Sequence, residues 1–344
     1  MPSLDKFKGI MDRAPTDVVG LDFATSGVRA VRMKKTASGL TVTAAELLPP
    51  ATLDAPADAS PKADAALVVP SSAQGRCAAL LTSDARAVLK LIRASEEVDL
   101  GKPEHVLSRI GIDPAQNYRV STRVIHSATV KTDALVLAAA MPENLAKAMV
   151  DLLPKVGPLA PRFIGVSALA VLNAFHNDPR NAGNETAHGL IHFDNDYSLV
   201  ALFNQGRLSQ LRTFPLGMAT FLQGTMEALG VDEETASGIL SAGAFDVSQL
   251  VEQQTRQLRA QYVGCRDFME RSENCTLKKL HVSGPAALAT AFLKGMEKEG
   301  IGEEWNALEG YPDRSPGSVP PALVSQPWLW SASIGACLGV LEPS

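Results

Sequence analysis

The sequence has few of the features that mark membrane or nucleic-acid-binding proteins. Lys and Arg number 32 against 37 Asp and Glu, a formal net charge of −5 at pH 7, so it lacks the basic excess of a nucleic-acid-binding domain. The longest uncharged stretch, Ser315–Leu341, is interrupted by prolines. Its final part, Trp328–Leu341, is shorter than the roughly 20 residues that span a bilayer. We therefore expect no nucleic-acid partner and no transmembrane segment.

Cysteines and familiar catalytic signatures are also scarce. The four cysteines lie far apart without a Cys-x-x-Cys pair, a pattern typical of reduced thiols in the cytoplasm. The segment Met1–Pro15 carries charges among its apolar residues and does not resemble a signal peptide. Neither a Gly-x-Ser-x-Gly elbow nor a Gly-x-x-x-x-Gly-Lys-Ser/Thr loop occurs. With 344 residues, 46% of them hydrophobic, the chain is predicted to form about two domains in the cytoplasm.

The chain contains two similar three-stranded patterns, half a chain apart. In each, an apolar run ends on an aspartate, a short polar turn follows, and two further strand-like runs complete a meander. The runs are Val18–Asp22, Val28–Met33 and Leu40–Leu48 in the first copy, and Gly189–Asp194, Tyr197–Asn204 and Arg207–Phe214 in the second. Asp22 and Asp194 hold the same place in the two copies. The repeat predicts two related halves, each opening with a β-meander.

The remaining patterns alternate between strands and helices. Near the end of the chain, the strand-like run Leu277–Gly284 leads through a glycine turn into a helix that begins at Ala286, a step that directs backbone N–H groups toward a ligand. The other predicted strands are Ala65–Pro70, Cys77–Leu81, Arg119–His126 and Thr132–Ala140, and the predicted helices are Ser83–Ala94, Pro142–Leu153, Ser167–Phe175, Met218–Ala228, Asp232–Ser241, Val247–Glu270 and Ala286–Glu299. Together these elements predict an α/β protein of two lobes with a cleft between them.

Five stretches in this order carry a resemblance to a known superfamily. They are VVGLDFATSGVRAVRM, LAPRFIGVSALAVLNAF, LRTFPLG, LHVSGPAALATAFLKGM and SIGACLGVL. The chain resembles the actin-like ATPases, which include actin, Hsp70 and FtsA, and within them it looks most like the PilM family of type IV pilus assembly proteins. It ends without the amphipathic tail of FtsA, which favours the PilM branch.

The resemblance implies a fold and a division of the chain. The expected fold is the two-lobed actin-like ATPase fold, with duplicated ribonuclease-H-like lobes and an inserted small α/β subdomain of the FtsA and PilM type. Residues 1–72 and 154–188 would form the first lobe, residues 73–153 the inserted subdomain, and residues 189–344 the second lobe.

The resemblance also implies an ATP site with Mg²⁺ between the lobes. Each hairpin would face the phosphates, and the later strand–glycine–helix step would hold the adenosine. Asp22 and Asp194 would hold Mg²⁺ through water. The implied ligand-binding residues are Asp22, Ala24, Thr25, Ser26, Gly27, Asp194, Asn195, Asp196, Gly217, Ser283, Gly284 and Pro285.

The chain departs from the family pattern at each of these motifs. Ala24 and Asp196 stand where the family has glycine, and Ser283-Gly284-Pro285 replaces a Gly-Gly pair. No carboxylate lies in 165–168 to orient a water molecule. Asp194-Asn195-Asp196 also suits an ordinary polar β-turn, and Ser283–Pro285 an ordinary strand-to-helix turn. We therefore expect weak ATP binding with slow or absent turnover, and a pseudo-ATPase stays open; no catalytic residue is assigned.

By resemblance, the expected function is that of a cytoplasmic scaffold, peripheral to the inner membrane, in the type IV pilus assembly complex. It would dock the cytoplasmic N-terminal tail of a PilN-like membrane protein on the inserted subdomain and contact other pilus assembly and motor proteins. Filament-forming relatives leave a homo-oligomer open. Two alternatives stay open as well: an active ATP-dependent kinase or ATPase of the same fold, and a GspL-like type II secretion scaffold.

Overall fold

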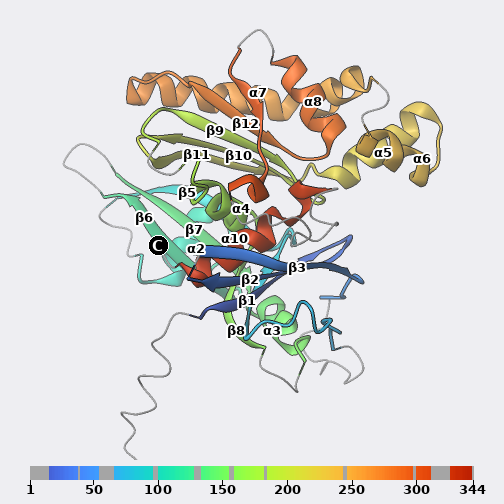
Figure 1. The fold of residues 1–344 in the computed structure, drawn as a ribbon. Helices are drawn as coiled ribbons and strands as arrows, with labels where there is room; N and C mark the ends of the chain where they lie inside the picture. Colours follow the sequence, from blue (N-terminus) through green and yellow to red (C-terminus); the bar gives the residue numbers. More distant parts are fainter. Residues whose placement is uncertain are drawn as a thin grey trace, which may run out of the picture.

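The fold consists of two large sheets, a smaller third sheet and helices around them (Figure 1). A computed structural model describes residues 15–37, 39–53, 66–95, 100–127, 133–154, 159–181, 184–242, 246–296, 300–310 and 326–342. Its helices include α2 (Pro103–Ile110), α3 (Glu143–Asp151), α4 (Ser167–His176), α5 (Met218–Leu229), α6 (Glu233–Ala242), α7 (Ser248–Glu273), α8 (Ala286–Gly295) and α10 (Ser331–Leu341).

The two large sheets share one topology. The first has the order β3-β2-β1-β4-β8 and the second β11-β10-β9-β12-β13. In each, the first three strands along the chain form an antiparallel meander, and two further strands add in parallel to its opening strand. The strands are β1 (Asp17–Ala24), β2 (Gly27–Thr36), β3 (Gly39–Leu48), β4 (Cys77–Thr82), β8 (Ala160–Val166), β9 (His188–Phe193), β10 (Ser198–Asn204), β11 (Arg207–Phe214), β12 (Lys279–Ser283) and β13 (Gly302–Glu304). The predicted duplication is confirmed.

Burial explains why each meander opens with an apolar run. Every residue of β1 is buried, because β2 and β4 flank it and α10 packs against it. A sharp turn joins β1 to β2, and Gly27 there has φ +144°. A Cβ at this position would lie 2.6 Å from the carbonyl oxygen of Leu48. Glycine therefore lets the hairpin turn approach the backbone at the end of β3.

The third sheet lies between β4 and β8 in sequence. It has the order β5-β7-β6, with β5 (Val88–Ala94), β6 (Tyr118–His126) and β7 (Ala134–Pro142). Helix α2 packs on it through Val106, Leu107 and Ile110. The predicted helix Ser83–Ala94 is therefore wrong. Its residues from Val88 onward pair with β7, so pairing with a neighbouring strand outweighs a local pattern of helical spacing.

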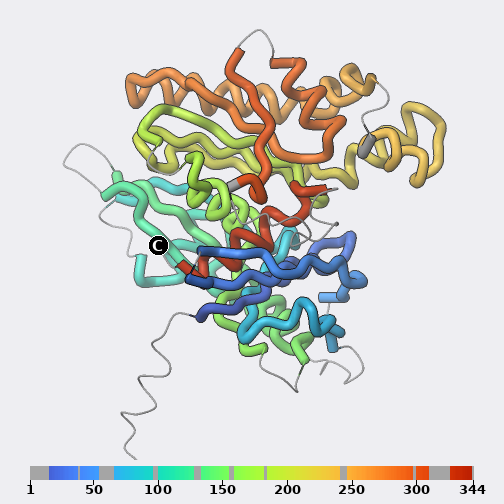
Figure 2. Tube along the Cα trace, viewed as in Figure 1, coloured from blue at the N-terminus to red at the C-terminus, as the bar shows by residue number. Residues whose placement is uncertain are grey.

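Two helices lie between the large sheets. Helices α4 and α10 cross so closely that a Cβ on Gly335 would lie 1.8 Å from the carbonyl oxygen of Ala170. Figure 2 shows the C-terminal segment, in red, between the strands of the first lobe and the second lobe. On the far side of the second sheet, α7 and α8 cover a core of their own. In the part of the chain described, no helix has the length and apolar character needed to cross a membrane.

The predicted division into domains stays a prediction, and two elements bear on its boundaries. Strand β4 falls within the predicted insert 73–153 but pairs with β1 and β8 of the first sheet. Helix α10 falls within the predicted second lobe but packs against β1, β2 and α4. The predicted strand Ala65–Pro70 is wrong for its described part, since 66–70 forms no strand.

Candidate functional site

The aspartates of the two hairpins meet at one buried arginine. Arg29 lies on β2, and its Nη1 is 3.1 Å from Asp22 Oδ2 and 2.7 Å from Asp194 Oδ1. Arg29 and Asp22 are completely buried, and Asp194 is 1% exposed. Ser167, the first residue of α4, donates from Oγ to Asp22 Oδ1 at 2.5 Å. The interlobe site thus contains a buried cluster of two carboxylates, one guanidinium and one hydroxyl.

The shared guanidinium gives the two carboxylates opposite pKa shifts. Burial raises the pKa of Asp22 to about 6, although Arg29 and Ser167 act against it. Burial also acts on Asp194, but Arg29 and His192 outweigh it and hold the pKa of Asp194 well below its ordinary value. This difference agrees with the distances, because Arg29 lies closer to Asp194. Asp194 is therefore the ion-pair partner, and Asp22 is the carboxyl that takes up a proton more readily.

A second cluster joins the turns of the two hairpins. The carboxylate of Asp196 accepts from the backbone N–H of Thr25 at 3.1 Å, from the Thr25 hydroxyl, and from Ser83 Oγ at 2.6 Å. Asn195 Nδ2 donates to Thr25 Oγ1 at 2.9 Å and to Asp196 Oδ1 at 2.7 Å. Thr25 and Ser83 follow β1 and β4 of the first sheet, whereas Asn195 and Asp196 follow β9 of the second. These bonds therefore cross between the lobes.

The helix that follows the second hairpin is engaged with that hairpin's turn. The N–H groups of Met218 and Ala219 donate to the carbonyl oxygens of Asp194 and Asn195, at 2.8 and 3.1 Å. Gly217 makes this approach possible, because a Cβ there would lie 2.2 Å from the Asn195 oxygen. The first backbone N–H groups of α5 are therefore hydrogen-bonded to the protein's own backbone.

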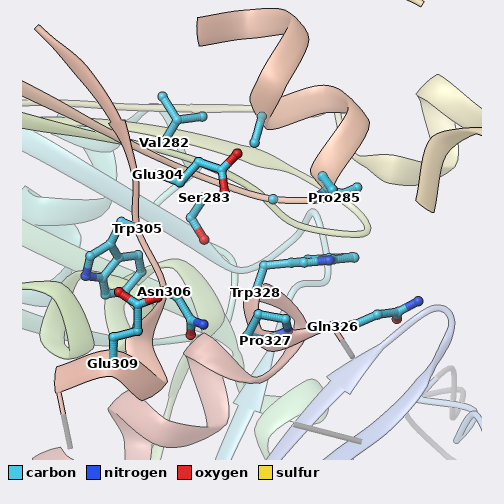
Figure 3. A pocket seen from close by; sticks show the side chains of 13 residues that line it. Val282, Ser283, Pro285, Glu304, Trp305, Asn306, Glu309, Gln326, Pro327 and Trp328 are labelled. Atoms are coloured by element: carbon cyan, nitrogen blue, oxygen red, sulfur yellow. The ribbon is translucent and has the colours of Figure 1, made fainter. Parts of the chain in front are cut away.

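The predicted adenosine step lines a separate cavity of about 250 Å³ (Figure 3). Ser283, Gly284 and Pro285 form one wall, and Trp305 and Trp328 lie on either side of the Ser283 hydroxyl in the close-up. Ser283 is 1% exposed, and its Oγ has no hydrogen-bond partner among the described residues. The lining contains carboxylates from Glu304 and Glu309 but no Lys or Arg. The described lining, with two carboxylates and no Lys or Arg, disfavours an anion.

The structure brings some of the predicted site residues together and leaves others apart. Asp22, Thr25, Asp194, Asn195 and Asp196 form the two clusters, and Gly217 lies against the second hairpin turn. Ala24, Ser26 and Gly27 belong to the same first turn. Ser283, Gly284 and Pro285 line the separate cavity, whose lining includes no residue of either hairpin. Their role in binding a ligand stays a prediction.

The residues in the clusters do not fit a triphosphate with Mg²⁺. Mg²⁺ requires several oxygen ligands and water around it, but a guanidinium nitrogen already lies against both aspartates. No group of three His, Cys, Asp or Glu suited to a metal occurs in the described ranges. The backbone N–H and hydroxyl of Thr25 in the first turn, and the hydroxyl of Ser83 after β4, are engaged by the Asp196 carboxylate. Arg29 Nε and Nη2 lack partners among the described residues, but they are buried.

Sequence reasoning missed two residues of this site, Arg29 and Ser83. Arg29 is a polar residue in the apolar run Val28–Met33, and Ser83 was expected to begin a helix. The signal for Arg29 lies in the hairpin register: counting back from the Thr25-Ser26 turn places Arg29 directly opposite Asp22. A buried aspartate with an arginine across the strand pair predicts an ion pair. Nothing local identified Ser83, because its partner Asp196 lies 113 residues away.

One further hollow lies beside the third sheet. A cavity of about 530 Å³ is lined by β6, β7 and β8, and a second of about 210 Å³ continues from it toward α4 and α10. Ser121, Ala139 and Phe163 line both. Strands β6 and β8 are each at the edge of their sheet among the described strands. We call this hollow the β6–β8 groove.

Comparison by sequence gives no match, either to a protein-family model or to a curated protein. Comparison by structure does give matches among solved structures. The PilM–PilN type IV pilus biogenesis complex gives a TM-score of 0.63 at 14% identity, covering 95% of this chain and 99% of that chain. A Bacteroides thetaiotaomicron protein with actin-like ATPase fold and unknown function gives 0.46 at 9% identity, covering 86% and 95%. The cytoplasmic domain of EpsL, an inner membrane component of the Vibrio cholerae type II secretion system, gives 0.33 at 11% identity, covering 63% and 76%.

The first of these structures matches the fold of this chain over nearly the whole length of both chains. Its near-complete coverage agrees with the duplicated sheet topology and with the sheet inserted between β4 and β8. The resemblance indicated by the sequence motifs is therefore confirmed at the level of the fold: the chain has the two-lobed α/β fold of the actin-like ATPases.

Proposed function

We propose that this chain is a cytoplasmic scaffold of a pilus assembly machine, peripheral to the inner membrane, which docks an extended segment of a PilN-like membrane protein. The observation that carries the proposal is the likeness over nearly the whole of both chains to a structure of a PilM–PilN complex. The same likeness makes pilus assembly a better-supported setting than type II secretion. Contacts with other assembly and motor proteins belong to the same proposal.

The β6–β8 groove supports this proposal as the docking place. Two edge strands border it, and the unpaired backbone groups of an edge strand can bind an extended peptide. Its floor is mainly apolar, with Phe163, Leu169 and Ala139 among its lining residues. Apolar pockets along such a groove select alternate side chains of a bound strand. We therefore expect the bound segment to be extended and largely apolar.

The proposed scaffold does not depend on ATP turnover. Asp22 and Ser167 bond to each other, and the donors around Thr25 are bonded to Asp196. None of these groups is left to orient a water molecule at a phosphate. Binding of ATP and Mg²⁺ is at most weak in this proposal, and an active kinase or ATPase finds no supporting observation among the described residues.

The test is binding of a labelled synthetic peptide with the sequence of the cytoplasmic N-terminal tail of the PilN-like protein from the same organism. Ser121→Trp places a large side chain in the groove from an exposed position on β6. Thr43→Trp makes a comparable change at an exposed position on β3, outside the groove. We expect Ser121→Trp to weaken binding about tenfold or more, a loss of at least about 1.4 kcal/mol, while Thr43→Trp binds as the wild type does.

Fluorescence anisotropy measures this directly, and circular dichroism checks that both variants fold. Equal affinity of the wild type and Ser121→Trp would exclude the groove as the docking place. Absence of binding to the wild-type protein would contradict the proposed partner.

A further inference from the structure

We propose that this chain supplies its own ligand to the interlobe site: the Asp196 carboxylate stands in the phosphate place of the first hairpin turn, and the Arg29 guanidinium stands in the cation place between Asp22 and Asp194. The two lobes are thereby held together without nucleotide. The inference goes beyond the proposed scaffold function and does not depend on peptide docking.

The contacts of Asp196 are those that a protein gives to a phosphate oxygen. A backbone N–H and a hydroxyl come from Thr25 in the turn, and a second hydroxyl comes from Ser83. Turn N–H groups and small hydroxyls form typical anion sites in proteins. Here the anion is a side chain of the other lobe. Because a carboxylate oxygen accepts these bonds as a phosphate oxygen would, the donors of Thr25 and Ser83 are satisfied without a bound anion.

The Asn195 amide completes the arrangement at the same turn. It donates to the Thr25 hydroxyl oxygen, which in turn donates to Asp196. It also donates directly to Asp196 Oδ1. The chain of donors and acceptors is therefore consistent, with one proton for each bond. A polar β-turn that merely faced solvent would not require this alignment with a residue 170 positions away.

Arg29 makes the corresponding contact deeper in the site. It originates in the first sheet, and it binds Asp194 of the second. A buried cation between two buried carboxylates offsets their mutual repulsion, which is the electrostatic part of what a bound metal ion would do. Unlike an ion, it is attached to the chain and cannot dissociate.

A further contact joins the third sheet to the second lobe. Edge strand β5 lies against edge strand β11. The Arg93 guanidinium lies 5.9 Å from the ring centroid of Phe268 on α7. On β11, Arg207 Nη1 lies 3.3 Å from His126 Nδ1.

A ligand shifts a conformational equilibrium only by its differential affinity for the two states. Because Asp196 and Arg29 already make these contacts, a nucleotide gains little by binding between the lobes.

The test removes the internal anion. Asp196→Gly takes away the carboxylate and frees the donors of Thr25 and Ser83, and Asp133→Gly is a matched control at an exposed position outside the site. Thermal unfolding of the full chain is followed with and without ATP·Mg²⁺, and separately with inorganic phosphate. We expect no ligand-dependent shift in Tm for the wild type or the control. We expect Asp196→Gly to have a lower Tm, which either ligand partly restores.

Small-angle scattering supplies a second readout. The wild type is expected to keep one radius of gyration with and without ATP·Mg²⁺, and Asp196→Gly to expand and then contract when the ligand is added. If Asp196→Gly fails to fold, Asp196→Asn, which keeps the shape and one acceptor oxygen, is expected to show the same effects in smaller size. An ATP·Mg²⁺-dependent rise in Tm of the wild type equal to that of the variant would overturn the proposal. So would identical behaviour of the Asp196 variants and the control.

Discussion

Replacing Arg29 with methionine tests the buried cluster most sharply. The substitution keeps an unbranched side chain of similar length but removes the positive charge that two aspartates share. Breaking a buried ion pair by removing one partner costs about 3–5 kcal/mol, because the remaining charge is left uncompensated. All three side chains are almost fully buried, so solvent screening does not reduce this figure. We expect a loss of about 3–5 kcal/mol in the free energy of unfolding near pH 7.

The pH dependence of that loss follows from Asp22. In the wild type the pKa of Asp22 is about 6, and Arg29 holds it down from a higher value. Without Arg29 this pKa rises further, so the folded variant keeps its proton above pH 6, where the wild type has released it. Above pH 6, each further pH unit therefore lowers the free energy of unfolding of the variant by about 1.4 kcal/mol more than that of the wild type. The deficit of Arg29→Met should therefore grow from pH 6 to pH 8.

Urea unfolding followed by circular dichroism at pH 6, 7 and 8 measures both effects. Arg32→Met is the matched control, because Arg32 lies on the same strand and binds Asp17 through two hydrogen bonds, at 2.8 and 2.7 Å, in a partly exposed place. It should cost at most about 1 kcal/mol. A cost of Arg29→Met no greater than that of Arg32→Met, or a deficit that does not change with pH, would refute the reasoning.

Two further predictions concern stability. The raised pKa of Asp22 contributes stability that is present below the ordinary pKa near 4 and is lost as the pH rises to about 6. The free energy of unfolding of Asp22→Asn, measured by urea titration, should therefore rise by about 2–3 kcal/mol relative to that of the wild type between pH 4 and pH 7. A difference between the two proteins that does not change with pH would contradict the assignment. Gly335→Ala forces a Cβ into the carbonyl oxygen of Ala170 and should lower the free energy of unfolding by about 1–3 kcal/mol. Gly339→Ala, whose Cβ meets only a side-chain atom at 3.3 Å, should be neutral or stabilising, and equal effects of the two would argue against close packing of α4 on α10.

The duplicated fold was predictable because its signal is local. Each opening strand is buried throughout and mostly apolar, and an aspartate lies near its end with a turn behind it. Burial within a sheet requires such an apolar run. The helices predicted to begin at Ser167, Met218 and Ala286 begin at these residues in the structure, as α4, α5 and α8. The strand β5 was not predictable in this way, because its residues have helical spacing and only pairing with β7 decides their conformation.

The candidate site was predictable only in part. The sequence identified both hairpin turns, and its resemblance to the family implied that Asp196 occupies a position where glycine is usual. It did not show what that carboxylate contacts, because Thr25 is 171 residues away. The charge of Arg29 suggested an exposed position, since arginine is rarely buried without a partner, and its second partner Asp194 lies in the other half of the chain.

One measurement tests the central claim of a docking scaffold that works without nucleotide. It is the dissociation constant of the labelled PilN-like tail peptide for the wild-type chain, with and without saturating ATP·Mg²⁺. The account predicts binding whose affinity is the same in both conditions, because the interlobe site is already filled by Asp196 and Arg29. A change of about tenfold or more on adding nucleotide, equivalent to about 1.4 kcal/mol of coupling between the sites, would contradict it.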